Sequence, residues 1–96
     1  MKIHVEVFIA SRTLSENQST FSPQEIVHFI EEEFHDTRSG VQTHATAVCV
    51  ANAPKNHGVT YNYLWLEDSA KYRVFNPAHD LPAQGKEKSA ILPKKE

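Results

Sequence analysis

The chain contains one well-defined helix start, at Ser22-Pro23-Gln24-Glu25. A serine here accepts a hydrogen bond from the backbone N–H three residues later, and a glutamate at that later position reaches back to the serine N–H. Proline suits the first helical position because its missing N–H would have no partner there. The apolar face that follows is formed by Ile26, Phe29, Ile30 and Phe34. The pattern predicts an amphipathic helix to about residue 34, with the run 31–33 (Glu-Glu-Glu) facing water.

The N-terminal segment fits two periodicities. Ile3, Val5 and Val7 alternate as in a strand, and β-branched residues favour strands. Ile3, Val7, Ala10 and Leu14 also form one stripe of a helix. The segment is about sixteen residues long without a turn signal, and this length favours a helix. Phe21, just before the capping serine, either packs back onto the second helix or pairs as a very short strand.

A third helix is predicted after the tight turn at residues 36–40. Its narrow buried stripe consists of Val41, Ala45 and Val48, with Cys49 at the edge. The opposite side would present Thr43, Thr46, Ala47 and Val50, flanked by Gln42. Small uncharged residues on an outward face are unusual, since a solvated helix normally shows lysine and glutamate there. Proline at position 54 ends this helix by residue 52, because the residue before a proline resists the helical conformation.

The remaining segments read as loop, hairpin and tail. Residues 52–62 are polar, and the β-rich runs 63–67 and 72–75 flank a turn at 68–71. The stretch from 77 to 96 carries three prolines, one glycine and four lysines, which is typical of a flexible C-terminal tail. We therefore expect one domain, residues 1–76. The order helix, short extended piece, helix, turn, helix, loop, hairpin predicts an α+β fold, the winged helix-turn-helix.

The residues that carry this order also resemble a family. The stretches "FSPQEIV", "THATAVCVANAP" and "YLWLEDSAKYRVFNP" are similar to a family of small winged-helix domains that occur alone in bacteria and archaea or appended to restriction-type nucleases. The resemblance covers roughly residues 20–77. It implies a winged-helix fold and, through that fold, DNA binding or protein contacts. The net charge of −2 and the acidic residues at the wing tip depart from a typical DNA-binding winged helix.

Charge is unevenly distributed along the chain. The sequence holds 12 acidic residues, yet none lies between residues 37 and 66. A DNA duplex would be repelled by the second helix and tolerated by the third, which favours a DNA-binding face on the third helix. Polar side chains there suit base edges, and cations nearby suit phosphates. The candidate DNA-binding residues are Arg38, Gln42, Thr43, Thr46, Lys55, Asn56, His57, Lys71 and Arg73.

Two aspects of this assignment have alternatives. Arg73 either follows a phosphate or makes a cross-strand ion pair with Glu67. The third-helix face either contacts DNA or packs against a protein partner through Ala47 and Val50. Trp65, Tyr72 and Phe75 are expected in the core, since a small domain needs buried aromatic rings.

Other chemistries are not indicated. His28 and His35 are seven residues apart, and His44 precedes Cys49 by five, so neither pair has zinc-site spacing. No glycine-rich phosphate loop is present, and Cys49 has no activating neighbour in sequence. We expect no enzyme activity, no metal and no cofactor. The single cysteine and the lack of a membrane-spanning run lead us to expect a soluble cytoplasmic protein. The expected activity is DNA binding in transcriptional regulation or beside a DNA-modification or defence system, with a homodimer formed through the first helix.

Overall fold

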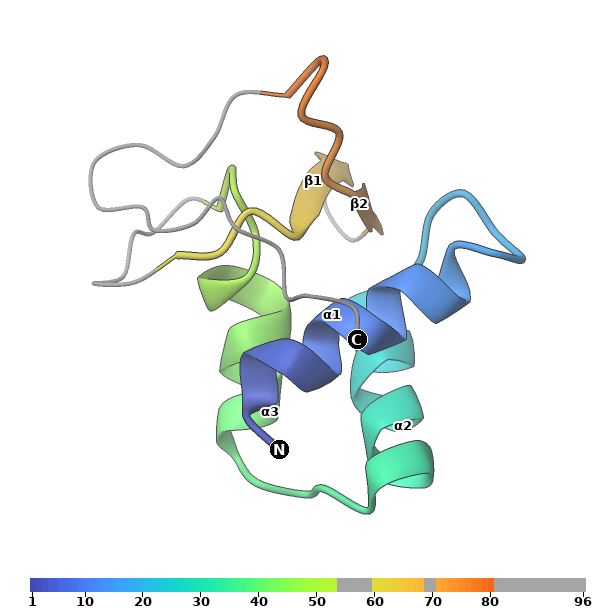
Figure 1. The fold of residues 1–96 in the computed structure, drawn as a ribbon, viewed down its shortest axis with the longest axis vertical. Coiled ribbons are helices and arrows are strands. Elements are labelled where there is room, and N and C mark those ends of the chain that lie inside the picture. The colour runs from blue at the N-terminus through green and yellow to red at the C-terminus, as the bar shows by residue number, and fades with distance from the viewer. Residues whose placement is uncertain (54–59, 69–70, 81–96) are drawn as a thin grey trace.

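A computed structural model describes residues 1–53, 60–68 and 71–80 (Figure 1). The helices are α1 (Ile3–Leu14), α2 (Pro23–Phe34) and α3 (Gly40–Thr43), and α3 continues directly into a π-helical segment, η1 (His44–Val48). The strands β1 (Leu64–Asp68) and β2 (Lys71–Val74) form an antiparallel hairpin. Three helices with a two-stranded hairpin make an α+β arrangement that is compatible with a winged helix, as the sequence predicts.

The N-terminal segment is a helix, not a strand. Val7 and Ala10 on the predicted stripe are fully buried, and Ile3 and Leu14 at its ends pack partly buried against the core. The helix lies across both other helical segments (Figure 1), so its apolar stripe is covered from two sides. The length of the segment favours the helix over the strand, because a helix of twelve residues packs about three turns of this apolar stripe against the core.

Helix α2 begins at the predicted capping residue. The Ser22 side chain accepts from the backbone N–H of Glu25 at 3.2 Å, and Pro23 occupies the first turn. The helix ends at His35, which adopts the left-handed conformation with φ of 54° and donates its N–H to the Glu31 carbonyl. Ile26 and Ile30 are buried, whereas the glutamate run 31–33 is exposed as predicted.

The third helical segment starts at a close contact with α1. A Cβ on Gly40 would lie 3.2 Å from the Ile3 side chain, so a glycine lets the two helices approach here. The segment ends at Val48, earlier than the predicted limit of residue 52. The Cys49 N–H bonds to the His44 carbonyl five residues back, the spacing of a π turn.

The predicted outward position of Val50 is wrong. Val50 is 1 % exposed and forms a parallel bridge with Leu64. Helical periodicity places Val50 beside Thr46 and Ala47, but the chain has left the helix before residue 50. The Ala51 N–H then donates to Leu64, and the Leu64 N–H donates to Cys49, both at 2.9 Å. The partner-binding patch that the sequence predicted at Ala47 and Val50 therefore loses Val50 to the core.

The segment before α2 pairs with the hairpin through a single antiparallel bridge at Phe21. Phe21 and Tyr72 exchange both backbone hydrogen bonds, at 2.9 and 2.8 Å, and both side chains are buried. This confirms the short-strand alternative for Phe21. Tyr72 lies in the core, as predicted, whereas Trp65 and Phe75 are only half-buried and contact one another with ring centroids 6.4 Å apart.

The described chain continues beyond the predicted domain limit at residue 76. Asp80 is buried, and its backbone N–H donates to the Asn76 carbonyl at 2.8 Å. The rest of the predicted flexible tail, residues 81–96, lies outside the described residues. Within the described segments, no helix has both the length and the apolar character needed to cross a bilayer.

Candidate nucleic-acid interface

The candidate interface centres on the outward side of α3. Gln42 and Thr43 are exposed, as the prediction of a polar outward face requires. Thr46 lies one turn further and is half-buried, and its hydroxyl donates to the Gln42 carbonyl at 2.9 Å. The Thr46 oxygen can still accept a hydrogen bond, but its proton is used inside the helix. Gln42 and Thr43 are therefore the uncharged hydrogen-bonding side chains that α3 exposes to solvent.

Arg38 precedes this face and is held by a carboxylate. Its Nε donates to Asp36 at 2.9 and 3.1 Å, and one terminal nitrogen donates to Asp36 Oδ2 at 2.6 Å. The same nitrogen donates to the Met1 carbonyl at 3.0 Å. The Arg38 side chain nevertheless remains 55 % exposed. Its position beside α3 is therefore fixed, while part of its charge is neutralised by Asp36.

A second carboxyl group, that of Glu6, lies under Arg38. Its side chain is 4 % exposed and lies 3.7 Å from the arginine. Burial, together with the neighbouring Asp36 carboxyl, raises the pKa of Glu6 to about 7. The hydrogen bonds from Arg38 instead hold the pKa of Asp36 well below its usual value. No sequence pattern pointed to this cluster, because Glu6 is 30 positions from Asp36 and looks like an ordinary surface residue of a helix.

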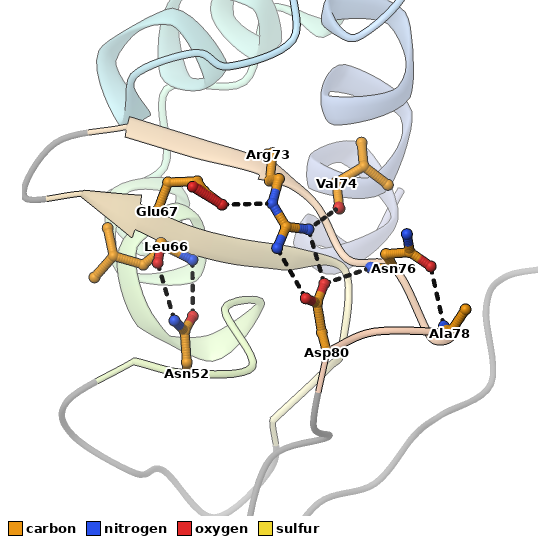
Figure 2. Close-up of polar contacts among 8 residues, drawn as sticks. All are labelled: Asn52, Leu66, Glu67, Arg73, Val74, Asn76, Ala78 and Asp80. Carbon is orange, nitrogen blue, oxygen red and sulfur yellow. Dashed lines mark hydrogen bonds and ion pairs between the residues drawn. The ribbon is translucent and has the colours of Figure 1, made fainter.

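The wing cation Arg73 is bound by two carboxylates (Figure 2). Its Nε donates to Glu67 at 2.7 Å, and its two terminal nitrogens each donate to one oxygen of Asp80 at 2.8 Å. The cross-strand ion pair with Glu67 is therefore confirmed. These hydrogen bonds raise the pKa of Arg73. With 28 % of its side chain exposed, Arg73 has less freedom to reach a phosphate than Lys71, which is exposed at the start of β2.

Two side-chain contacts around the wing were not predicted from the sequence. Asp80 also accepts from the Asn76 N–H at 2.7 Å, which closes residues 76–80 into a turn against β2 (Figure 2). The Asn52 amide donates to the Leu66 carbonyl at 3.0 Å and accepts from the Leu66 N–H at 2.7 Å. Asn52 thus pairs with β1 as a neighbouring strand would. Asparagine and aspartate near turn residues were the available signal, since both commonly bond to backbone groups.

Three predicted phosphate contacts cannot be placed. Lys55, Asn56 and His57 lie in the segment 54–59, outside the described residues. The predictions for these three residues stay predictions.

An acidic groove is found on another part of the molecule. Its volume is about 600 Å³, and its apolar lining comes from Leu14 and Phe29. Its remaining lining residues are Gln18, Gln24, Glu25, His28, Glu32 and Glu33. The Gln18 amide donates to the Glu25 carboxylate across it. The three glutamates of the groove belong to α2, whereas the candidate interface lies on α3, which is a separate helix (Figure 1).

In the described part of the chain, the residues with metal-binding or nucleophilic potential do not come together in one site. No group of three or more His, Cys, Asp or Glu side chains suited to a metal ion occurs in residues 1–53, 60–68 and 71–80. Cys49 is fully buried, and this burial raises the pKa of its thiol. A buried neutral thiol is a poor nucleophile.

No family model, curated protein or solved structure matches this chain. The resemblance to a winged-helix family, and the DNA binding that it implies, therefore remain predictions.

Proposed function

We propose that this protein binds double-stranded DNA through the exposed face of α3. The observation that carries the proposal is the pair Gln42 and Thr43, exposed and uncharged, within a 30-residue stretch that contains no acidic residue. Glutamine and threonine are side chains that hydrogen-bond to base edges in the major groove. The arrangement of helices and hairpin, compatible with a winged helix, supports the same use of the third helix.

Phosphate contacts would come from Arg38, which precedes this face, and from Lys71 on the wing. Arg38 is oriented by Asp36 and half exposed, and Lys71 is exposed on the wing. Because Arg73 is bound by Glu67 and Asp80, its role is to hold the wing, and it contributes little to phosphate binding. Among the described residues, few free cations lie at the interface, and the net charge is −2, so we expect weak binding by a single copy with a shallow salt dependence. A homodimer on two half-sites would raise the affinity.

The biological setting that fits such a protein is gene regulation, or an accessory role beside a DNA-modification or defence system. Nothing catalytic is part of the proposal. The corresponding location is the cytoplasm, where the DNA of a bacterial or archaeal cell lies.

The test compares the same substitution on two helices. Gln42→Glu places a negative charge on the α3 face, and Gln24→Glu places the same charge on α2. Both glutamines are exposed in the parent chain. We expect Gln42→Glu to weaken binding to a fluorescent random 20-base-pair duplex at low salt about tenfold or more, through repulsion and a lost base contact. Gln24→Glu should change binding less than about twofold. Equal effects of the two variants, or no binding by the parent chain at tens of micromolar, would contradict the proposal.

The acidic groove favours a second candidate, a protein-interaction module. Its three glutamates and its apolar floor of Leu14 and Phe29 complement a lysine- or arginine-rich segment that carries one apolar anchor. A synthetic peptide of that composition should then bind the parent chain and Gln42→Glu equally. Glu32→Lys combined with Glu33→Lys should abolish this peptide binding while leaving the fold intact, because both side chains are exposed.

A further inference from the structure

Three ionisable side chains meet beneath the start of α3. Glu6 comes from the first turns of α1, whereas Asp36 and Arg38 come from the turn between α2 and α3. The Glu6 and Asp36 side chains are only 4 % and 6 % exposed. One nitrogen of Arg38 lies 3.7 Å from Glu6 and 2.6 Å from Asp36. The cluster therefore links the N-terminal helix to the cation that precedes the proposed DNA-binding face.

The charges in this cluster do not balance when both carboxyl groups are ionised. Asp36 accepts three side-chain contacts from Arg38 and also its backbone N–H at 3.0 Å. Glu6 has only the longer contact to Arg38, and its Oε1 is buried without a hydrogen-bond partner in the described part of the chain. One guanidinium thus compensates one carboxylate, and an ionised Glu6 would be a buried charge without adequate compensation.

The two carboxyl groups also act on one another as like charges. Asp36 accepts its hydrogen bonds from Arg38, and these bonds keep its carboxylate ionised. Burial and the neighbouring Asp36 disfavour the ionised form of Glu6, so the proton resides on Glu6.

We propose that the Glu6 carboxyl is a proton-binding site that regulates the DNA-binding face of α3. With the proton bound, Glu6, Asp36 and Arg38 together are neutral. Once Glu6 loses it, the same cluster carries one negative charge next to the residues that approach DNA, and both carboxylates hold Arg38 away from a phosphate. This inference rests on the proposed function, and it names how that function responds to pH.

The transition falls near neutral pH. The pKa of Glu6 is raised to about 7, first by burial and then by Asp36, while Arg38 and the amino group of Met1 act in the opposite sense. An added charge at roughly 10 Å from a phosphate, partly screened by salt, corresponds to an affinity change of about two- to fivefold. His4 on α1 lies two positions from Glu6 and near His44 of η1, and burial lowers the pKa of His4, so the effect of Glu6 must be isolated by substitution.

The experiment uses the full chain and two glutamine substitutions. Glu6→Gln removes the ionisable group but keeps its shape, and Glu31→Gln makes the same change at an exposed position of α2. Binding to a fluorescent 20-base-pair duplex is measured by anisotropy from pH 5.5 to 8.5 at constant ionic strength. We expect the parent chain and Glu31→Gln to lose about two- to fivefold more affinity over this range than Glu6→Gln loses. The same pH dependence in all three proteins would overturn the proposal.

A second measurement separates the proton site from DNA binding. Carbon-detected NMR follows the side-chain carboxyl signals of Glu6 and Glu31 in the parent chain without DNA. A Glu6 midpoint near 7, with backbone amides of α3 shifting at the same midpoint, supports the proton site even where the duplex fails to bind, and only the proposed function is then lost. A Glu6 midpoint equal to that of Glu31 overturns the proton site whatever the DNA measurements give.

Discussion

Arg73 and Asp80 illustrate how single residues fix the wing. Asp80 accepts hydrogen bonds from both terminal nitrogens of Arg73 and from the Asn76 N–H, with all three distances between 2.7 and 2.8 Å. A bidentate pair of this kind combines charge with a planar fit. The Arg73 guanidinium also lies over the Trp65 ring, 5.8 Å from its centroid. One arginine thus joins β1, β2 and the segment after β2.

Removing the Asp80 charge should weaken this junction. In Asp80→Asn, one amide nitrogen faces the guanidinium and at most one hydrogen bond is kept, so Arg73 stays half-buried with Glu67 as its remaining charged partner. We expect the free energy of unfolding to fall by about 1–3 kcal/mol, measured by urea denaturation at pH 7. The control Glu33→Gln changes an exposed carboxylate of α2 and should stay within about 0.5 kcal/mol. A loss no larger than that of Glu33→Gln would contradict the structural role of Asp80.

At the scale of elements, local and non-local causes can be separated. The start of α2 was predictable because capping depends on residues 22–25 alone. The end of the third helical segment was not, because Val50 leaves the helix to pair with Leu64, 14 positions away. The short strand at Phe21 likewise depends on Tyr72. The start of an element can be predicted from the sequence when neighbouring residues set it. An end that a distant partner sets cannot be predicted in this way.

The cap of α2 gives a test at this scale. Ser22→Ala removes the side-chain acceptor for the Glu25 N–H and should cost about 1 kcal/mol of stability. For a domain of this size, that loss corresponds to a fall in melting temperature of roughly 4–8 °C. Ser19→Ala, at an exposed position before the helix, is the matched control and should melt within about 2 °C of the parent chain. Equal melting temperatures for both variants would mean that the cap contributes nothing.

At the scale of the whole molecule, pH changes stability through groups whose contributions have opposite signs. The pKa of Glu6 is raised from 4.5 to about 7, so folding favours its protonated form. Its unfavourable contribution is absent below about pH 4.5 and grows as pH rises to about 7. Asp36 and Asp80 have lowered pKa values, so their stabilising contribution is present above 3.8 and is lost as pH falls below it. His4, whose pKa is lowered by burial, adds stability as pH rises to 6.5.

Glu6→Gln should therefore stabilise the protein mainly at high pH. The difference in melting temperature between Glu6→Gln and the parent chain is expected to be small at pH 5. A small part of the effect is already present at pH 5, half a unit above the unfolded pKa, and the difference should reach roughly 4–10 °C in favour of the variant at pH 8, which corresponds to about 1–2 kcal/mol after allowance for solvent screening. Scanning calorimetry at half-unit pH steps measures it, and the histidines cancel because both proteins contain them. A difference that does not change with pH would contradict the raised pKa of Glu6.

The sequence by itself determined the α+β class, the order of the elements, the cap of α2 and the acid-free stretch 37–66. Each of these depends on residues close together in the chain, through periodicity, capping or local charge. Only the tertiary structure decided that Arg73 belongs to Asp80, that Val50 is buried against Leu64, and that Glu6 lies beneath Arg38. The reason is physical: burial and the pairing of charges are properties of side chains that folding brings together, and no spacing along this chain encodes which distant residue a carboxylate or a strand edge will meet.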